Sequence, residues 1–322
     1  MTAGRVVALC GGVGGAKLAA GLAAVLPPER LSVVVNTGDD FDHFGLRICP
    51  DIDTVLYTLS GRADSDRGWG RADESWRFME AVGELGGETW FNLGDTDLAL
   101  HAVRTAELQA GRRLTEVVGD LARRMGLGMA VLPATDGRVA TILQTDLGEL
   151  PLQHYFVRHR CAPAVSGVRF DLGAGTAATP EVAAALNPAG LACILFCPSN
   201  PYLSIDPILA VPGLRARIAV AGVPRIAVTP IVAGRALKGP LAKMMAEMGI
   251  PPGPEAIARH YAGLIDCLVA DAADAPIVAR AGAAPSGLPQ VAHLPTVMRS
   301  DADRVALARA VLELAGTKAD DG

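Results

Sequence analysis

The sequence predicts an α/β protein with a Rossmann-like fold, in which a mostly parallel sheet is flanked by helices. Short apolar runs, which are expected to be buried strands, alternate along the chain with helical patterns, and this alternation is typical of βαβ units. The first run, Val6 to Cys10, leads through a glycine-rich turn into a helical pattern, and the second, Leu31 to Val35, is apolar except for Ser32. Strands that are apolar throughout are buried on both faces, as in parallel sheets.

The rest of the chain continues this alternation. Further buried strands are expected at Met129–Leu132, Val139–Leu143, Ala192–Cys197, Ile226–Thr229 and Cys267–Ala270. Helices are expected at Lys17–Leu26, Thr96–Ala110, Thr115–Met125, Pro180–Leu186, Leu241–Met248, Pro254–Tyr261 and Asp301–Leu314. Half of the 322 residues are hydrophobic, so residues 1–322 are expected to form a single α/β domain with a large core.

The stretch from about residue 61 to residue 128 departs from this alternation. It is mostly helical in pattern and contains all three tryptophans, Trp69, Trp76 and Trp90. We expect a helical insertion between strands that acts as a lid. Because ligands bind at the carboxyl ends of the strands in open α/β sheets, the loops that follow the strands should form the site beneath this lid.

Composition argues against several classes of partner. The net charge of −5 gives no basic surface for nucleic acid, and aromatic residues make up only 4% of the chain. No apolar run approaches the roughly 20 residues that span a bilayer, and the N-terminus leads into a strand without a signal-peptide pattern. Of the six cysteines only Cys193 and Cys197 are close in sequence, which favours buried free thiols over a metal site. We expect a soluble, cytoplasmic protein.

The glycine-rich turn after the first strand predicts a phosphate site. It contains Gly11, Gly12, Gly14 and Gly15, followed by Lys17. A strand, a glycine turn and a helix in this order aim backbone N–H groups at an anion. The spacing is neither the dinucleotide fingerprint nor a Walker loop. The alternative is a tight turn that only packs the first helix against the first strand, with Lys17 as a surface charge.

The loop after the second strand is rich in acidic residues. It runs from Asn36 through Thr37 to Asp39 and Asp40, with Asp42 and His43 close behind, and Asp51 and Asp53 come just before the next helical run. Clustered carboxylates need a cation or hydrogen-bond donors, and Mg²⁺ takes one or two carboxylates together with substrate phosphates. A metal-assisted phosphate site is therefore expected. The alternatives are helix N-caps at Asp51 or Asp53 and solvated turn residues elsewhere.

Two further loops carry polar residues with weaker signals. Asp95 or Thr96 is expected to be the N-cap of a long helix. Ser199 and Asn200 lie between two prolines at the end of a buried strand. They are either contacts to a phosphate or a base, or part of a plain turn.

Several of these motifs occur in the order known from one enzyme family. They are Gly11 to Lys17, Val33 to Asp40, Leu46 to Thr54, Leu93 to Asp95 and Pro198 to Pro201. Together they resemble the 2-phospho-L-lactate transferase family of coenzyme F-420 biosynthesis, over nearly the whole chain. The Asn-Thr-Gly-Asp-Asp loop followed by Cys-Pro-Asp-Ile-Asp-Thr is the most specific part of the resemblance.

The resemblance implies a reaction. A phospho-acid (2-phospholactate, phosphoenolpyruvate or 3-phosphoglycerate) moves from its guanosine-diphosphate-activated form to the terminal ribityl hydroxyl of the deazaflavin Fo, and GMP is released. Mg²⁺ is the implied cofactor and a homodimer the implied assembly. Such a transfer needs in-line positioning and charge stabilisation more than covalent help from the protein.

The resemblance also implies roles for individual residues. The glycines of the first turn and Lys17 would bind the diphosphate, and Ser199 and Asn200 the guanosine part. Asp51 and Asp53 would hold Mg²⁺, and Asp53 also matches an aspartate of the family that contacts Fo. The expected catalytic residues are Asp39, Asp40 and Asp53, with Asp39 or Asp40 as metal partner or general base. The remaining substrate-binding positions are Asn36, Thr37, Asn92 and Asp95; archaeal members tend to carry a lysine at the position of Asn92.

Two other functions compete with this one. Related proteins of similar fold are non-catalytic regulators that bind a nucleotide sugar, but their acidic loop differs from Asp39-Asp40-Phe41-Asp42-His43. A nucleotide-dependent dehydrogenase is disfavoured because the dinucleotide fingerprint is missing.

Overall fold

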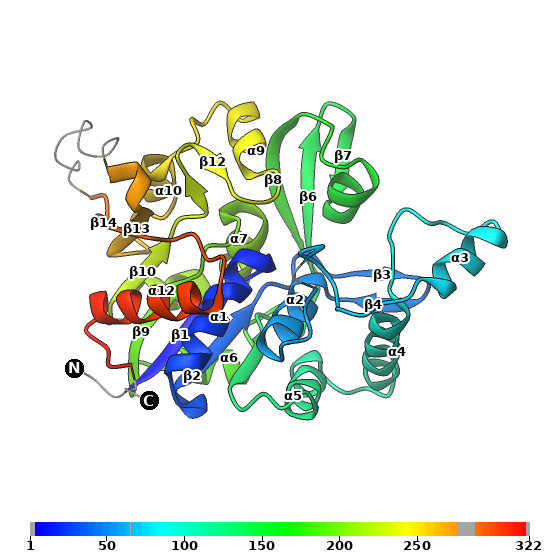
Figure 1. The fold of residues 1–322 in the computed structure, drawn as a ribbon, viewed down its shortest axis with the longest axis horizontal. Coiled ribbons are helices and arrows are strands. Elements are labelled where there is room, and N and C mark those ends of the chain that lie inside the picture. The colour runs from blue at the N-terminus through cyan, green and yellow to red at the C-terminus, as the bar shows by residue number, and fades with distance from the viewer. Residues whose placement is uncertain (1–3, 65, 276–286, 320–322) are drawn as a thin grey trace.

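A seven-stranded parallel sheet forms the centre of the computed structural model, which describes residues 4–64, 66–275 and 287–319 (Figure 1). In spatial order its strands are β14 (Gln290–Leu294), β13 (Cys267–Asp271), β10 (Arg225–Val228), β9 (Leu191–Phe196), β1 (Arg5–Cys10), β2 (Leu31–Val35) and β5 (Ala130–Pro133). The predicted fold class is confirmed. The chain builds outward from β1 in one direction through β2 and β5, and from β9 in the other, so the strand order reverses between β1 and β9.

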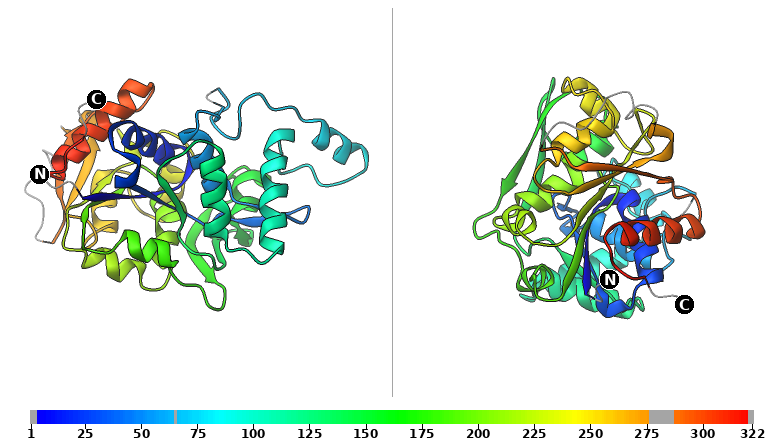
Figure 2. Two further views of the ribbon diagram at one scale, coloured as in Figure 1. Left: turned by 90° about the horizontal axis from the view of Figure 1, so that it is seen from below. Right: turned by 90° about the vertical axis from the view of Figure 1, so that its left-hand side faces the viewer.

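Helices cover both faces of this sheet (Figure 2). On one face lie α1 (Gly12–Val25), α2 (Pro50–Leu59), α5 (Leu114–Arg124) and α12 (Asp301–Leu314). On the other lie α6 (Pro180–Ala185), α7 (Asp206–Ala210), α8 (Leu214–Ala219), α9 (Leu241–Glu247) and α10 (Pro254–His260). Alternate residues of β1 enter the two cores, Ala8 on the first face and Leu9 on the second, which explains why the strand is apolar throughout. Within the described residues, no helix is long and apolar enough to cross a membrane.

One predicted strand lies outside the parallel sheet. The run Val139–Leu143 is a strand, β6 (Val139–Thr145), but it pairs antiparallel with β7 (Gly148–Pro151) and β8 (Val165–Leu172) in a separate sheet. The prediction of a buried parallel strand is therefore wrong here. Buried and less buried residues alternate along most of β6, as expected for a strand that is covered on one face.

Short elements that were not predicted complete the structure. They are the hairpins β3 (Phe41–His43) with β4 (Leu46–Ile48) and β11 (Ile231–Val232) with β12 (Arg235–Ala236), and the short helices η1 (Pro28–Arg30), η2 (His154–Arg158), η3 (Pro201–Ile205) and η4 (Ala272–Asp274).

The stretch 61–128 contains α3 (Arg77–Glu84) and α4 (Asp95–Gln109) as well as α5. Figure 1 shows α3 and its neighbouring loops projecting from one side of the molecule. Each of the helices α3 and α4 is capped by an acidic residue from outside its own N-terminus: Glu74 accepts hydrogen bonds from the N–H groups of Thr96 and Asp97, and Asp95 accepts one from that of Phe78. These reciprocal caps satisfy N–H groups that a helix cannot pair internally, and they tie α3 to α4.

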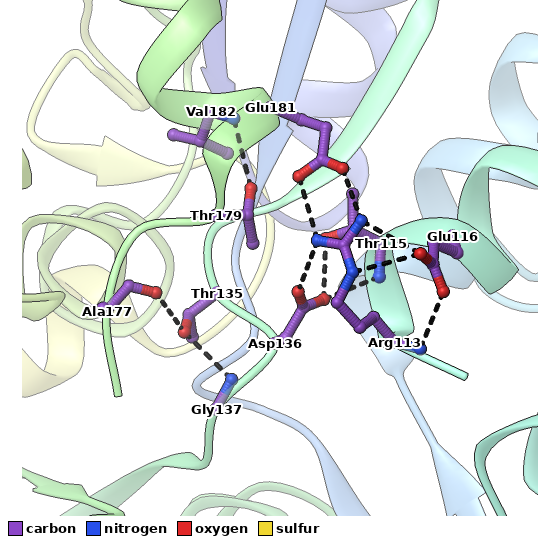
Figure 3. Close-up of polar contacts among 10 residues, drawn as sticks. All are labelled: Arg113, Thr115, Glu116, Thr135, Asp136, Gly137, Ala177, Thr179, Glu181 and Val182. Carbon is purple, nitrogen blue, oxygen red and sulfur yellow. Dashed lines mark hydrogen bonds and ion pairs between the residues drawn. The ribbon is translucent and has the colours of Figure 1, made fainter. Parts of the chain in front are cut away.

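A polar network joins α5 and α6 to the loop that leaves the main sheet (Figure 3). Asp136 follows β5, and its Oδ1 accepts hydrogen bonds from the N–H and the hydroxyl of Thr115, both at 2.7 Å. Arg113 pairs with Asp136 and with Glu181 in the first turn of α6. The network therefore fixes the point where the chain passes from the parallel sheet to β6.

Two glycines inside helices allow a matched test of the packing between α1 and α12. A Cβ on Gly21 would overlap the backbone of Arg304 in α12, whereas a Cβ on Gly119 in α5 would meet nothing within 4 Å. We expect Gly21→Ala to lower the free energy of unfolding by about 1–3 kcal/mol, as overpacking does. Gly119→Ala should raise it by up to about 1 kcal/mol, because alanine is the better helix former. Urea unfolding measures both, and a gain in stability for Gly21→Ala would contradict the close contact.

Candidate active site

A cavity of about 870 Å³ opens where the strand order of the parallel sheet reverses. Its wall includes the start of α1, the first turns of α2, the loop after β9 and part of the insertion. This is the place where open α/β sheets bind ligands. The loops predicted from the sequence therefore meet in one cavity.

The glycine segment is the beginning of α1 and forms no separate turn. Gly12 has a φ of +60°, which favours glycine, and its N–H donates to Asp51 Oδ1 at 2.7 Å. The N–H of Gly11 donates to Ser199 Oγ at 3.1 Å. The protein itself thus uses two of the N–H groups expected to face a phosphate. Those of Val13 and Gly14, in the first turn of α1, have no partner within the helix.

The other glycines permit close packing between segments of the protein. A Cβ on Gly14 would overlap the carbonyl oxygen of Pro198, and a Cβ on Gly15 would overlap Ser199 Oγ. The loop after β9 can therefore close directly over the first turn of α1. The packing role weighed for these glycines is present: a Cβ on Gly15 would also lie 2.9 Å from Cys10 Sγ in the first strand, and the loop after β9 is a second partner.

Asn36 connects two acidic side chains at the cavity. It is fully buried, and its Nδ2 lies 2.6 Å from Asp39 Oδ1 and 2.9 Å from Asp51 Oδ2. The N–H of Gly38 donates to its Oδ1, which fixes the orientation of the amide. Asp39 and Asp51 are thereby held on the same side of the cavity.

Asp39 and Asp51 have no positively charged partner among the described side chains. Burial raises the pKa of Asp51 to about 6, against hydrogen bonds from Asn36, Gly12 and Ser204. Burial and the neighbouring Asp51 raise the pKa of Asp39 well above its usual range. No described lysine or arginine forms an ion pair with either residue. Buried carboxylates that are short of compensating charge attract a proton or a cation.

Asp53 lies in a different environment from Asp51. Arg104 of α4, which is fully buried, donates to both of its oxygens, at 2.6 and 2.9 Å. Burial opposes the charge of Arg104, yet Asp53 and Cys49 hold the pKa of the guanidinium above its usual value. Arg104 was not predicted to belong to the site, because an arginine within a helical pattern normally lies on the solvent side.

Two more residues beside Asp53 were not predicted. Asp97 Oδ1 accepts a hydrogen bond from the hydroxyl of Tyr57 at 2.5 Å, and His101 Nε2 lies 3.4 Å from Asp97 Oδ2. Single ligand atoms of Asp53, Asp97 and His101 lie within 4.8 Å of one another, a spacing that a metal ion requires. Residues 97, 101 and 104 are spaced so that they share one face of α4, which is the signal that the sequence offered.

Aromatic residues of the insertion form another part of the wall. Arg67 lies over the rings of Trp69 and Trp76, at 5.4 and 4.9 Å from their centroids. Trp69 lines the cavity and is 50% exposed. Lys238, from the loop after β12, reaches across to the carbonyl oxygen of Gly68 at 3.5 Å. The insertion and this loop therefore meet at the cavity.

The structure brings two thirds of the predicted site residues to the cavity wall. They are Gly11, Gly12, Gly14, Lys17, Asp39, Asp51, Asp53, Asn92, Ser199 and Asn200. The predicted residues that do not line it are Gly15, Asn36, Thr37, Asp40 and Asp95.

Several of the predicted site residues, both at the wall and away from it, have partners within the protein. Burial raises the pKa of Asp40 to about 7, with a hydrogen bond from Cys49 acting against it. Asp95 accepts from Ser75 Oγ at 2.6 Å, in keeping with a capping role, although it caps α3 and the N-cap of α4 is Gly94. At the wall, Lys17 Nζ donates to the carbonyl of Met298 at 3.0 Å, and Asn200 Oδ1 accepts from the N–H of Tyr202.

Comparisons with known proteins show which family the chain is similar to. Residues 6–305 match the family model described as 2-phospho-L-lactate transferase CofD. A protein of Streptomyces coelicolor named phosphoenolpyruvate transferase is 42% identical over 319 residues, covering 97% of this chain and 98% of the relative. A protein of Nocardia farcinica with the same name is 36% identical over 334 residues, covering 98% and 96%.

A solved structure shares the fold at lower sequence identity. A UPF0052 family protein of Bacillus halodurans has a TM-score of 0.64 and 16% identity, covering 96% of this chain and 99% of that one. This likeness concerns the fold alone.

The buried ion pair between Arg104 and Asp53 makes a quantitative prediction. Arg104→Met leaves a buried carboxylate without its partner, which costs about 3–5 kcal/mol of unfolding free energy. The double variant Arg104→Met/Asp53→Asn should recover much of this loss, because no charge is left unpaired. Arg169→Ala, which breaks exposed ion pairs on β8, is the control and should change little. Equal stability of Arg104→Met and the wild type in urea would contradict the role of the pair.

Proposed function

The chain belongs to the 2-phospho-L-lactate transferase family, and we propose that it transfers a phospho-acid from its guanosine-diphosphate-activated form to the ribityl hydroxyl of the deazaflavin Fo, releasing GMP. Family membership makes it a transferase of coenzyme F-420 biosynthesis. The observation that carries the finer proposal is the pair of Asp51, which is buried, and Asp39, which is half-buried, without compensating charge beside the start of α1. Such a place suits a diphosphate together with a cation.

We propose phosphoenolpyruvate as the acid. The relatives that are 36–42% identical over nearly the whole chain carry the name phosphoenolpyruvate transferase. 2-Phospholactate and 3-phosphoglycerate remain the competing donors in the test below.

The proposed metal ligands are Asp51 and Asp39. Asn36 holds both carboxylates toward one point. Burial raises their pKa values, and Mg²⁺ would supply the positive charge that favours their ionised forms. Asp53, expected from the sequence to be the second ligand, already binds Arg104 through both oxygens and is the poorer choice. When bound, Mg²⁺ would neutralise charge on the phosphates during transfer.

The chain's own groups would position the two substrates. The free N–H groups of Val13 and Gly14, with Lys17, would bind the diphosphate, and the side-chain amide of Asn200 would contact the guanosine. The insertion, with Trp69 at the wall, would cover the deazaflavin. Asp53 would accept a hydrogen bond from the attacking hydroxyl.

We also propose a cytoplasmic homodimer. The support for a reducing compartment is that all six cysteines are free, four of them buried. Light scattering of the purified protein measures the assembly, and a monomer at working concentration would contradict this part of the proposal.

A coupled assay tests the reaction. The protein is mixed with Fo, Mg²⁺, GTP, a guanylyltransferase and the three candidate acids in competition, and deazaflavin products are weighed by mass spectrometry. We expect a product heavier by phosphoenolpyruvate. Asp51→Asn should lower kcat/KM by on the order of 100-fold, since a metal contact is lost. Unchanged Fo, with every donor demonstrably formed, would defeat the proposal and leave a nucleotide-sugar-binding regulator as the leading alternative.

A variant of Asp53 separates its two expected roles. If Asp53 contacts the hydroxyl and not the metal, Asp53→Ala should reduce turnover while the Mg²⁺ concentration for half-maximal rate stays near that of the wild type. Circular dichroism must show that the variant is folded. Full turnover in a folded Asp53→Ala protein would remove Asp53 from the catalytic residues.

Mg²⁺ binding should depend on pH in a defined direction. A ligand carboxylate must be ionised, and the pKa of Asp51 is about 6 without metal. Protons therefore compete with Mg²⁺ as the pH falls, and the affinity should drop about tenfold for each pH unit below about 6. Isothermal titration calorimetry at several pH values checks this, and an affinity that is equal at pH 5 and pH 8 would exclude Asp51 as a ligand.

A further inference from the structure

A second cavity lies outside the candidate active site, on the face of the sheet that carries α10. It has a volume of about 600 Å³, and no described residue lines both cavities. Its wall is formed by η3, by α10 and by the loop that leads into α10. Figure 1 shows α10 on the side of the molecule away from α3 and α4. We call this space the α10 cavity.

One part of the wall of the α10 cavity is apolar and held in place by the core. The apolar residues are Tyr202, Ile250, Pro251, Pro252 and Ala256. The ring centroid of Tyr202 lies 4.7 Å from that of His260. The ring of His260 lies in turn 5.0 Å from that of Tyr261, which is 5.2 Å from the ring of Phe196 in β9. This series of ring contacts anchors the wall to the central sheet, so the cavity is preformed.

The other part of the wall carries two opposite charges. Glu255 and Arg259 line the cavity one turn apart on α10. Opposite charges at this spacing usually pair, yet neither side chain forms an ion pair within the described part of the chain. The third ionisable group of the wall, His260, already has a partner, because its Nε2 lies 3.0 Å from Asp206 Oδ1. The charges of Glu255 and Arg259 are therefore available to a ligand.

The short helix η3 separates the α10 cavity from the active site. Tyr202 lines the α10 cavity, whereas the next two residues, Leu203 and Ser204, line the active site. The carbonyl oxygen of Leu203 accepts a hydrogen bond from Asn36 Nδ2 at 3.2 Å, and the hydroxyl of Ser204 donates to Asp51. A ligand that packs against Tyr202 would therefore restrain a turn that also holds groups of the active site.

A ligand that matches the whole wall carries a positive and a negative group close together on an apolar body. We propose that the α10 cavity is an effector site for a free α-amino acid with an aromatic or large aliphatic side chain. The carboxylate of the ligand pairs with Arg259, its ammonium group with Glu255, and its side chain packs against Tyr202. Such a ligand fits the volume, since pockets for small molecules measure roughly 300–1,000 Å³.

Binding of amino acids to the full-length protein tests the site. Isothermal titration calorimetry is performed with L-phenylalanine, L-leucine and L-tryptophan. Two analogues keep the phenylalanine side chain: N-acetylphenylalanine lacks the ammonium group, and phenylalanine amide lacks the carboxylate. We expect L-phenylalanine to bind at least about tenfold more tightly than either analogue, because each analogue loses a charge-assisted hydrogen bond.

Variants that remove one charge locate the site. Glu255→Gln and Arg259→Gln should each weaken the binding of L-phenylalanine at least about fivefold. The matched controls are Arg215→Gln on α8 and Glu313→Gln on α12, which remove exposed charges elsewhere and should bind as the wild type does. None of the four side chains is buried, and thermal unfolding confirms that each variant is folded.

Amide hydrogen exchange tests the effector role without turnover. The segments 9–15 and 36–40 contact η3 but do not line the α10 cavity. L-Phenylalanine should slow exchange in both segments of the wild type, because two sites that share a restrained element are coupled. Arg259→Gln should reduce this effect at the same ligand concentration.

Each outcome decides one part of the proposal. If none of the three amino acids binds, or if Glu255→Gln and Arg259→Gln bind L-phenylalanine as tightly as the wild type, the α10 cavity is not an amino-acid site. If one analogue binds as tightly as L-phenylalanine, the ligand class is wrong and a peptide terminus takes its place. If L-phenylalanine binds as expected but leaves exchange in 9–15 and 36–40 unchanged, the effector role is overturned. No arm of the test uses the transferase reaction, so the proposed function stands or falls separately.

Discussion

The first turn of α2 holds the site together, because its two buried carboxylates face different parts of the chain. Asp51 accepts from the N–H of Gly12 at the start of α1 and lies beside Asn36 after β2. Asp53, two residues later, is bound by Arg104 of the insertion. On a helix, residues two apart lie on different sides. One turn thereby joins the start of α1 to the insertion.

Close packing of backbone segments gives this junction its rigidity. The loop after β9 approaches α1 so closely that side chains on Gly14 or Gly15 would overlap it. Ser199 then both accepts from the N–H of Gly11 and donates to its carbonyl oxygen, at 3.1 and 2.8 Å. The ends of β1 and β9 are thus fixed at the point where the strand order reverses. A cavity built on such points is largely preformed.

The strands at the centre of the sheet could be predicted because their burial leaves a plain signal. β2 is found at its predicted bounds, since every one of its residues is buried and apolar runs identify such strands. β14 was missed because it is an edge strand whose residues are half-buried or exposed, so no continuous apolar run marks it. β6 was placed in the wrong sheet because a short apolar run does not reveal its pairing partners, which are β7 directly after it and β8 about twenty or more residues further along the chain.

The sequence could identify those site residues that lie in the loops directly after strands. Asp51 and Asp39 could be predicted because clustered carboxylates repel one another and need a cation or hydrogen-bond donors nearby. Arg104 carries almost no signal, because its burial depends on how α4 packs against β4 and on the approach of Asp53, both of which are tertiary properties.

The cavity contains two pairs of carboxylates, Asp39 with Asp51 and Asp53 with Asp97. The pairs differ in how far neighbouring groups of the protein compensate their charge, and this difference suggests a different kind of ligand for each pair. Asp51 is buried and Asp39 beside it is half-buried, with amide and hydroxyl donors only, so in the proposed function a cation from outside the chain would supply the missing positive charge. Asp53 and Asp97 already have Arg104, Tyr57 and His101 as partners, so their remaining lone pairs are suited to neutral donors. Under the proposed reaction, the cation and the phosphates belong to the first group and the hydroxyls to the second. Since one turn of α2 carries a member of each group, the attacking oxygen and the phosphorus would be brought together by the backbone of that turn.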